Sequence, residues 1–353
     1  MHETIGSFFR GKKILITGHT GFKGAWLSVW LSECGAQVIG YALKPDIEPS
    51  LFQLCHLDKK IKSYVCDVRN PEMLKSVFAE HEPEIVFHLA AQSLVRLSYR
   101  RAVETYETNV MGTVNVLEAC RLTPSVKAIV NITSDKCYEN KEWLWSYREN
   151  DPLGGDDPYS SSKACAEIVA NAYQKSFFKT EGKGIASARA GNVIGGGDWA
   201  RYRLVPDCLR ALENKTPITV RNPQSVRPWQ HVLEPLRGYL MLAAALYREP
   251  EKISGPWNFG PEIYSAVSVR DVVEKIILEW NEGGWEHVPS DRSLHEAGTL
   301  KLDSSKATTL LGWRPKWDVH TAISKTVQWH KQYMNKINMY EVCIAQIQEY
   351  LKT

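Results

Sequence analysis

The stretch ILITGHTGFKGAWL, residues 14–27, decides the fold. Its first residues have the composition of a buried β-strand, and its last residues have that of a helix. Between them, Gly18, Gly21 and Gly24 form the pattern G-x-x-G-x-x-G. The first glycine permits a tight turn, the second brings the backbone close to a pyrophosphate, and the third lets the helix pack on the strand. This arrangement, with a helix N-terminus facing the loop, predicts a dinucleotide site.

Strand-like and helix-like segments alternate from this loop to about residue 190. Further strands are predicted by the apolar runs 37–43, 62–68, 84–90, 127–133 and 184–191, and helices are predicted over 70–81, 102–121 and 161–178. Asn70 and Pro71 begin the first of these helices. Such alternation is typical of right-handed crossovers in a parallel sheet. We therefore expect an α/β fold with a doubly wound parallel Rossmann-type sheet, whose ligands bind at the carboxyl ends of the strands.

The alternation fails after about residue 190, where Gly, Pro and Trp become frequent. We expect residues 1–190 to form an NAD-binding domain, to which a segment near 230–262 returns, and residues 191–353 to form mainly a smaller, mixed α/β substrate domain. In the tail, Ile337, Tyr340, Ile344, Ile347 and Leu351 have the spacing of one helical stripe. This stripe either docks on its own subunit or contacts another subunit.

Composition excludes several classes of protein. The 353 residues are 44% hydrophobic and 24% charged, with a formal net charge of +3 and no long block of Lys or Arg, so no nucleic-acid partner is expected. No run approaches the roughly 18 apolar residues that span a bilayer, and the first residues lack the apolar core of a signal peptide. The eight cysteines include no C-x-x-C pair. We expect free thiols, a cytoplasmic location, no membrane partner and no metal.

Several residues near the glycine loop are candidates for contact with the cofactor. Phe22 lies within the loop, and Ala90 is one of the small residues that follow the predicted fourth strand. His19 occupies a loop position where a small residue would leave more room. Its ring either folds over the pyrophosphate or points to solvent.

The end of the predicted second strand bears on the choice between NAD and NADP. Ala42 stands where an acid usually binds the ribose 2′-hydroxyl, and Asp46 lies further on. NAD is therefore favoured only moderately on these residues. Asp67, after the predicted third strand, is a candidate acceptor for the adenine amino group.

A second motif, DPYSSSKACAE, places Tyr159 and Lys163 on one face of a helix. A tyrosine pKa near 10 is too high for acid–base work near neutrality, but a neighbouring ammonium favours the phenolate. Ser134 ends the predicted strand 127–133 and can bind the same substrate oxygen. A Tyr-x-x-x-Lys pattern alone is usually a solvated helix face. Together with the serine and the glycine loop it predicts an oxidoreductase site.

These motifs resemble the extended short-chain dehydrogenase/reductase family over nearly the whole chain. Within it, GHTGFKGAWLS, TSDKCYEN, YSSSKACAE, SARAGNVIGGGDWA and RPWQHVLEPL are similar to the nucleotide-sugar 4,6-dehydratases. The resemblance implies tightly held NAD, a hexose linked to a nucleoside diphosphate, and loss of water between C5 and C6 on a route to deoxysugars of surface polysaccharide. It also implies a homodimer, or a higher homo-oligomer, paired through the helices around Asn109 and Lys163.

The same resemblance gives a use to Asp135 and Lys136, which follow Ser134. In such enzymes the tyrosine takes the C4 hydroxyl proton, and the resulting ketone acidifies the proton on C5. A base must then remove that proton, and an acid must protonate the departing C6 hydroxyl. Many relatives carry Asp-Glu here, whereas this chain has Asp-Lys, which favours Asp135 as the acid and Lys136 as the base. The alternative is a surface Asp-Lys dipeptide without function.

On the substrate side, Asn192 and Arg227 resemble the diphosphate-binding asparagine and arginine of the family, and Arg203 is a further candidate. A guanidinium suits bidentate binding of phosphate. The alternative for each arginine is a surface ion pair. These residues do not indicate which base the nucleotide carries. A nucleotide-sugar epimerase or reductase of the same family remains an alternative activity, but it has no use for Asp135 and Lys136.

Overall fold

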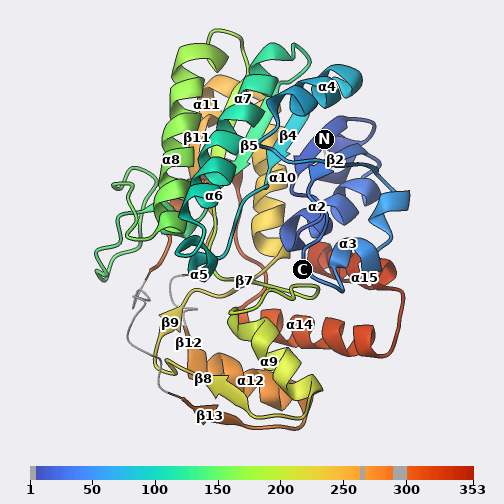
Figure 1. The fold of residues 1–353 in the computed structure, drawn as a ribbon, viewed down its shortest axis with the longest axis vertical. Helices are drawn as coiled ribbons and strands as arrows, with labels where there is room; N and C mark the ends of the chain where they lie inside the picture. The colour runs from blue at the N-terminus through green and yellow to red at the C-terminus, as the bar shows by residue number, and fades with distance from the viewer. Residues whose placement is uncertain (1–4, 263–266, 289–299) are drawn as a thin grey trace.

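The computed structural model describes residues 5–262, 267–288 and 300–353, and it divides into a large upper part and a smaller lower part (Figure 1). The large part is built on a seven-stranded sheet in the order β11-β6-β5-β4-β1-β2-β3, with every neighbouring pair parallel. Its strands are β1 (Lys13–Thr17), β2 (Gln37–Ala42), β3 (Lys62–Val65), β4 (Ile85–His88), β5 (Ala128–Ile132), β6 (Gly184–Arg189) and β11 (Gly255–Asn258). The doubly wound parallel sheet predicted from the sequence is confirmed.

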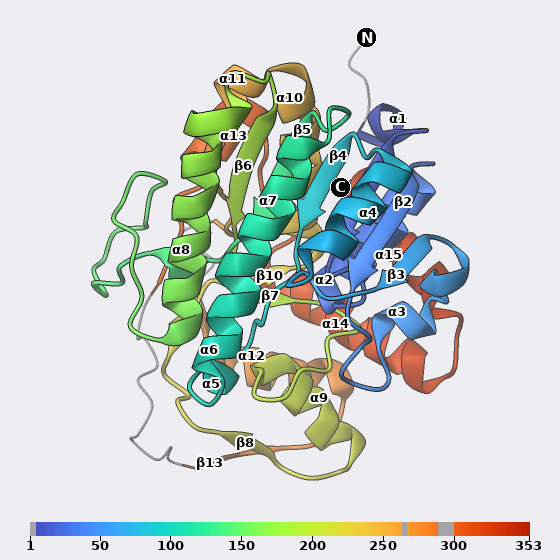
Figure 2. The same ribbon diagram turned by 45° about the horizontal axis from the view of Figure 1, so that its top comes forward.

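Helices cover both faces of this sheet. Its central strands are continuous apolar runs, which must be buried on both sides. One face carries α4 (Pro71–His81), α7 (Gly112–Leu122) and α8 (Pro158–Tyr173), and the other carries α2 (Phe22–Glu33) and α10 (Leu233–Arg248) (Figure 2). Shorter helices of this part are α1 (Ile5–Phe9), α3 (Leu51–Leu54), α5 (Val95–Ser98), α6 (Ala102–Tyr106), α11 (Pro250–Ile253) and α13 (Ser305–Leu311).

Two predicted helices differ in detail from the observed ones. The region 102–121 is divided into α6 and α7 by a π-helical turn over Glu107–Met111. The helix expected from residue 161 begins at Pro158, because the Asp157 side chain accepts from the Ser160 N–H and caps it. The helix expected from Asn70 begins as predicted, with the Asn70 side chain accepting from the Met73 N–H.

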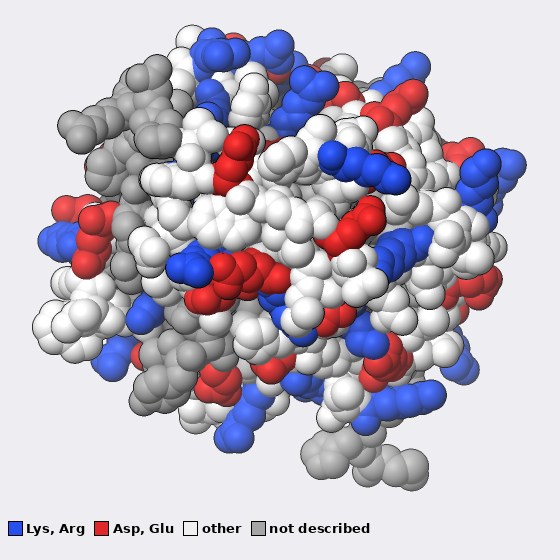
Figure 3. All heavy atoms as spheres, turned by 90° about the horizontal axis from the view of Figure 1, so that it is seen from below, with Lys and Arg blue, Asp and Glu red and all other residues white. Residues whose placement is uncertain are grey.

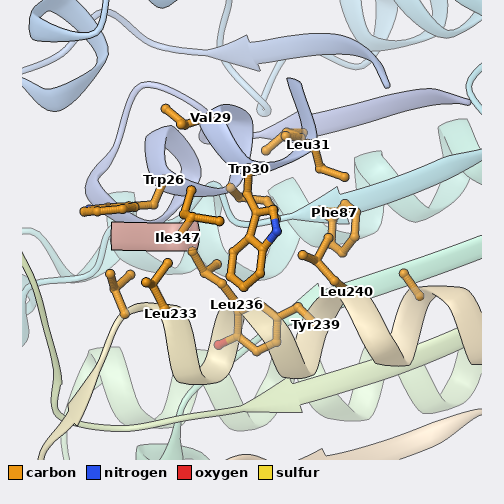
Figure 4. Packing of buried hydrophobic residues seen from close by; sticks show 14 of the residues in the cluster. Trp26, Val29, Trp30, Leu31, Phe87, Leu233, Leu236, Tyr239, Leu240 and Ile347 are labelled. Atoms are coloured by element: carbon orange, nitrogen blue, oxygen red, sulfur yellow. The ribbon is translucent and has the colours of Figure 1, made fainter. Parts of the chain in front are cut away.

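The main core lies between the sheet, α2 and α10 (Figure 4). Trp26 and Trp30 of α2 meet Leu236 and Leu240 of α10 there, all almost fully buried. Burial of each such side chain contributes roughly 1.5–3 kcal/mol. The core thus fixes the helix that begins at the glycine loop.

The C-terminal helix α15 (Met339–Lys352) docks on this core, which confirms the first of the two alternatives for the tail. The buried stripe is not the predicted one, however. Tyr340 and Ile347 are buried as expected, but Ile337 and Leu351 are exposed, and Cys343 and Tyr350 take their places. Helices α2 and α15 lie against one another.

The smaller part has its own hydrophobic core among α9 (Leu204–Glu213), α12 (Val269–Trp280) and α14 (Val319–Met334). Its short strand pairs are β7 (Val193–Ile194) with β10 (Gln230–His231), β8 (Ile218–Val220) with β13 (Trp285–His287), and β9 (Val226–Arg227) with β12 (Val267–Ser268). Between these elements the chain returns to the large part as α10 and β11, and it does so again as α13 and α15.

Two surface properties bear on possible partners: the length of the apolar helices and the distribution of charged side chains. Within the described ranges, no helix is long and apolar enough to cross a membrane. Figure 3 shows the molecule from below, where basic and acidic side chains are interspersed. The side chains that are described on that face form no continuous basic strip.

Candidate active site

The predicted site residues gather where successive parallel strands end. The glycine loop follows β1, Ala90 follows β4, Ser134 follows β5, and Asn192 follows β6. Since β1, β4, β5 and β6 are neighbours in the sheet, these loops lie at one carboxyl edge. This is the edge at which open α/β sheets bind ligands.

The glycine loop has the tight packing that its sequence predicted. Gly18 has φ of 76°, and a Cβ on it would fall 2.7 Å from the Ala90 nitrogen. A Cβ on Gly24 would fall 2.1 Å from the Gly18 carbonyl oxygen. Helix α2 begins at Phe22 without a side-chain cap. Its first N–H groups therefore face a cradle into which an anion fits.

Neither expected position of the His19 ring is observed. The ring is fully buried against β2, where a Cβ on Gly40 would fall 2.4 Å from it. Its Nε2 lies 2.7 Å from Ser63 Oγ, and its edge packs on Phe52. Burial lowers the His19 pKa to about 4. The glycine in β2 provides the space that the imidazole occupies, so His19 lies behind the loop.

Ser134, Tyr159 and Lys163 are all buried. The Lys163 ammonium donates to the Ile132 carbonyl at 3.2 Å, which holds it beneath the end of β5. Burial lowers the Lys163 pKa to about 8. Burial raises the Tyr159 pKa to about 12, although a hydrogen bond with Ser134 opposes the rise. The three groups are thus brought together, with a phenol that needs a further positive charge to ionise near neutrality.

Asp135 and Lys136 lie on a single 3-10 turn, Asp135–Cys137, that begins immediately after Ser134. The Ser134 hydroxyl donates to Asp135 Oδ1 at 2.9 Å and accepts from the Lys136 N–H at 3.3 Å. Asp135 is only 5% exposed, and Lys136 is half-buried. The surface-dipeptide alternative is therefore wrong for Asp135.

Arg203 joins the two parts of the molecule beside this site. Its Nη1 binds Asp198 Oδ2 at 2.9 Å, and its Nη2 donates to Ser93 Oγ at 3.3 Å. Ser93 follows β4, whereas Arg203 precedes α9. The positive charge of Arg203 also lowers the pKa of Tyr159, which places the guanidinium near the phenol.

Lys23, the second residue of α2, is a site residue that the sequence reasoning missed. Burial lowers its pKa to about 8, and the charges of Arg203, Asp135 and Lys163 act on it as well. Its ammonium therefore belongs to the same cluster of charges. The available signal was a lysine inside the G-x-x-G-x-x-G motif, directly before its third glycine.

The remaining candidates have their own contacts, Asn192 and Asn109 in the large part and Arg227 in the smaller part. Asn192 has φ of 49°, and its carbonyl accepts from the Gln230 N–H at 3.2 Å. Arg227, on β9 of the smaller part, is half-buried and donates to the Val226 carbonyl at 3.0 Å. Asn109 is buried, and its side chain donates to Ser162 Oγ of α8.

Asp67 lies beyond the end of β3, at the same edge of the sheet. Arg69 binds its carboxylate through Nε and Nη2, at 3.0 and 2.7 Å. This pairing lowers the Asp67 pKa. The Asp67 carboxylate is therefore ionised and is shared with a neighbouring arginine.

Fold and site together define a class. A doubly wound sheet with a glycine loop after its first strand, and with a serine, a tyrosine and a lysine at its carboxyl edge, is that of an extended short-chain dehydrogenase/reductase. Over residues 15–326 the chain matches the family model described as GDP-mannose 4,6 dehydratase. The chain belongs to this family, as the motifs of the sequence predicted.

Individual relatives agree with this assignment. The chain is 51% identical over 350 residues to CDP-glucose 4,6-dehydratase of Salmonella typhimurium, covering 98% of both chains. An epimerase of Methanothermobacter thermautotrophicus has a similar fold, with a TM-score of 0.80, 23% identity, and coverage of 94% of this chain and 96% of that one. The structure of dTDP-glucose 4,6-dehydratase of Bacillus anthracis in complex with NAD is also similar, with a TM-score of 0.76 and 22% identity. The match covers 94% of this chain and 100% of that one.

Proposed function

We propose that the protein is an NAD-dependent hydro-lyase that converts CDP-glucose to CDP-4-keto-6-deoxyglucose, a step toward deoxysugars of surface polysaccharide. The observation that carries the proposal is the turn that sets the buried Asp135 beside Ser134 and Tyr159 and continues directly into Lys136. Oxidation at C4 requires only Ser134, Tyr159 and Lys163. Elimination of water requires a further acid and base. Similarity to the Salmonella enzyme over the full chain supports cytidine as the base.

The glycine loop fits NAD. Gly18, Gly21 and Gly24 with the start of α2 would hold the pyrophosphate, while Phe22, Ala90 and Asp67 would lie beside the rest of the molecule. No acid stands at Ala42, so the ribose must be bound by other groups. Bound there, NAD would supply hydride chemistry, as the acceptor for oxidation at C4 and the donor for reduction at C6. Its positive charge would also lower the Tyr159 pKa.

Tyr159 acts first, as the base for the C4 hydroxyl. Burial alone keeps the phenol protonated, but Ser134 and Arg203 favour the phenolate. Lys163, on the same face of α8, adds positive charge to the site and is held there by the Ile132 carbonyl. Ser134 donates to the substrate oxygen as the ketone forms.

Asp135 and Lys136 act second. The C4 ketone acidifies the proton on C5, and Lys136, when neutral, takes it. Asp135, when protonated, donates to the C6 hydroxyl as it departs. As the cycle closes, Lys136 would give a proton back to C5, Tyr159 would release its proton to solvent, and Asp135 would regain one from solvent. No net reductant is consumed, because the hydride removed from C4 is returned at C6.

The diphosphate of the substrate would lie between the two parts of the molecule. We assign NAD binding to residues 1–190 with the returning segment near 230–262, and substrate binding mainly to residues 191–353. Arg203 and Arg227 supply guanidinium groups that bind phosphate oxygens in pairs. The left-handed backbone at Asn192 supports a role for its amide beside them.

The test is to incubate the protein with CDP-glucose and to measure the enone absorbance that 4-keto-6-deoxy sugars give in alkali. UDP-, GDP- and dTDP-glucose serve as matched substrates, compared by kcat/KM. We expect the highest value with CDP-glucose. Turnover to a C4 epimer, or consumption of added reduced cofactor without an enone, would replace the proposal by the epimerase or reductase alternative.

We also propose a homodimer, or a higher homo-oligomer, formed through α6–α7 and α8. Val103, Met111 and Ile168 are apolar residues of these helices with 73%, 51% and 57% of their surface exposed. Light scattering after size exclusion should give at least twice the chain mass, and Ile168→Asp should reduce it. All eight cysteines are free thiols, which supports work in a reducing cytoplasm.

A further inference from the structure

A buried ion pair joins α8 to the end of β6. Glu167 and Arg189 are 5% and 2% exposed. Arg189 binds the carboxylate with two parallel bonds, Nε to Oε1 and Nη2 to Oε2, each 2.9 Å long. Glu167 lies one helical turn beyond Lys163 on α8. A planar guanidinium held in this way has a fixed orientation.

Each member of the pair also binds one of the two residues that flank the Ser134–Cys137 turn. On the upstream side, Thr133 Oγ1 donates to Glu167 Oε1 at 2.5 Å. On the downstream side, Arg189 Nη1 donates to the Tyr138 hydroxyl at 2.7 Å. One ion pair therefore holds both ends of the turn that carries Asp135 and Lys136.

The downstream end is tied most firmly. The Tyr138 hydroxyl donates in turn to Asn258 Oδ1 at 2.8 Å, and the Arg189 guanidinium lies over the Tyr138 ring, 4.7 Å from its centre. Arg189 also donates to the Glu149 carbonyl at 3.1 Å. Because every charged atom of the pair has a partner, the cluster is rigid as well as buried.

Two of the three oxidation residues, Tyr159 and Lys163, have supports outside the ion pair, whereas Ser134 begins the turn itself. The Tyr159 N–H donates to Ser98 Oγ, and the Lys163 ammonium binds the Ile132 carbonyl. Neither bond passes through Glu167 or Arg189. Loosening the ion pair or its contacts should therefore move Asp135 and Lys136 more than it moves Tyr159.

We propose that Glu167 and Arg189 are positioning residues for the elimination step, acting through Thr133 and Tyr138 to aim Asp135 and Lys136 at C5 and C6 of the sugar. The inference rests on the proposed dehydration and deepens it. It assigns Asp135 and Lys136 to one support in the fold, and Tyr159 and Lys163 to others.

The test compares two substitutions of the same kind in one aromatic stack. Tyr138→Phe removes the hydroxyl that binds Arg189. Tyr147→Phe is the matched control, because its ring stacks on Tyr138 at 5.0 Å while its hydroxyl contacts only Asn140 and Lys141 in the described ranges. Thr133→Val tests the upstream side with little change of shape.

We expect Tyr138→Phe to slow elimination roughly tenfold, the effect of about one lost bond to a charged group, and to leave C4 oxidation near its wild-type rate. Reduced nicotinamide should then accumulate after rapid mixing with CDP-glucose, and incorporation of solvent deuterium at C5 should slow. Thr133→Val should act in the same direction, and Tyr147→Phe should do neither. Thermal unfolding of all three variants should stay close to that of the wild type.

Two results separate failure of this inference from failure of the proposed function. If the wild type gives no enone from CDP-glucose, the dehydration is wrong and this inference falls with it. In the second case the wild type dehydrates CDP-glucose, while Tyr138→Phe and Thr133→Val slow oxidation and elimination equally, or slow neither of them. Either outcome overturns the positioning role alone.

Discussion

The backbone of Gly191 lies directly against the carboxylate of Asp135, so closely that a Cβ on Gly191 would fall 1.8 Å from Oδ2. Gly191 follows β6 and Asp135 follows β5, and these strands are neighbours in the sheet. The absence of a side chain at residue 191 therefore sets how deeply the Asp135 carboxylate can lie. The opposite side of that carboxylate accepts from Ser134.

Gly191→Ala should displace Asp135 and impair elimination. The new methyl group cannot coexist with the observed carboxylate position, so Asp135 must rotate away from Ser134. We expect dehydration to slow at least about tenfold, toward the ~10²–10⁴ typical of a lost acid, while nicotinamide reduction persists. Gly284→Ala is the matched control, because nothing lies within 4 Å of its new Cβ. Unimpaired dehydration in Gly191→Ala would show that the depth of Asp135 is unimportant.

Oxidation and elimination should also separate when the acting residues themselves are changed. Tyr159→Phe should abolish both, since no base remains to start the reaction. Asp135→Asn and Lys136→Met should still reduce nicotinamide on addition of substrate, while elimination slows by ~10²–10⁴. Rapid mixing followed by near-ultraviolet absorbance measures the first step, and the alkaline enone assay measures the whole cycle.

Isotopes distinguish the two roles within the pair. Substrate deuterated at C4 should give product deuterated at C6, and C5 should take its new hydrogen from solvent. Normal turnover by Lys136→Met with solvent deuterium at C5 would remove Lys136 as the base. If neither Asp135→Asn nor Lys136→Met affects elimination, the pair has no part in the chemistry.

The features that local sequence could predict are those whose partners are near in the chain. The spacing of Gly18, Gly21 and Gly24 specified the turn, and the spacing of Tyr159 and Lys163 specified a shared helix face. In each case a few consecutive residues contain the whole physical argument. The parallel sheet followed in the same way, from the alternation of segments.

The features that it could not predict depend on register between distant segments. The position of the His19 ring is set by Gly40 in the next strand, and that of Asp135 is set by Gly191. The contact from Arg203 to Ser93 joins residues on different parts of the molecule. No spacing rule connects such pairs, because the sheet and the domain arrangement bring them together.

Arg227→Ala should raise KM more than it lowers kcat, because a diphosphate clamp acts alike in the ground and transition states. A charge-assisted bond of this kind contributes ~1.5–3 kcal/mol, or roughly a tenfold to hundredfold change in affinity. Arg203→Ala should lower kcat as well, since its charge lowers the Tyr159 pKa. Steady-state kinetics with CDP-glucose measure both.

Arg210→Ala is a suitable control for the two arginines. Arg210 lies on α9, seven residues after Arg203, but it pairs with Asp207 on the same helix. Its loss should leave KM unchanged. A normal KM in Arg227→Ala would favour the alternative interpretation of Arg227, a surface ion pair without a role in substrate binding.

Stability should fall in mild acid because of His231. The ring is fully buried between Trp26 and Trp317, and its Nδ1 accepts from the Leu233 N–H. Burial lowers the His231 pKa from 6.5 to about 3. Between these values the unfolded chain binds a proton that the folded chain does not. The contribution of neutral His231 to the free energy of unfolding is therefore complete above about pH 6.5. As the pH falls from there toward 3, this free energy decreases by ~1.4 kcal/mol per pH unit.

His231→Gln removes the titration while keeping an acceptor for the Leu233 N–H. The free energy of unfolding is measured by urea for the wild type and the variant at about pH 7.5 and about pH 5.5. On going to the lower pH, the wild type should lose ~1.4 kcal/mol more of this free energy than the variant does. Other groups that titrate in this range are common to both proteins and cancel in the comparison. Between about pH 7.5 and 8.5 the difference should stay constant, which is the internal control. A difference that does not change on acidification would mean that His231 accepts a proton in the folded protein, through the Nε2 that has no hydrogen-bond partner among the described residues.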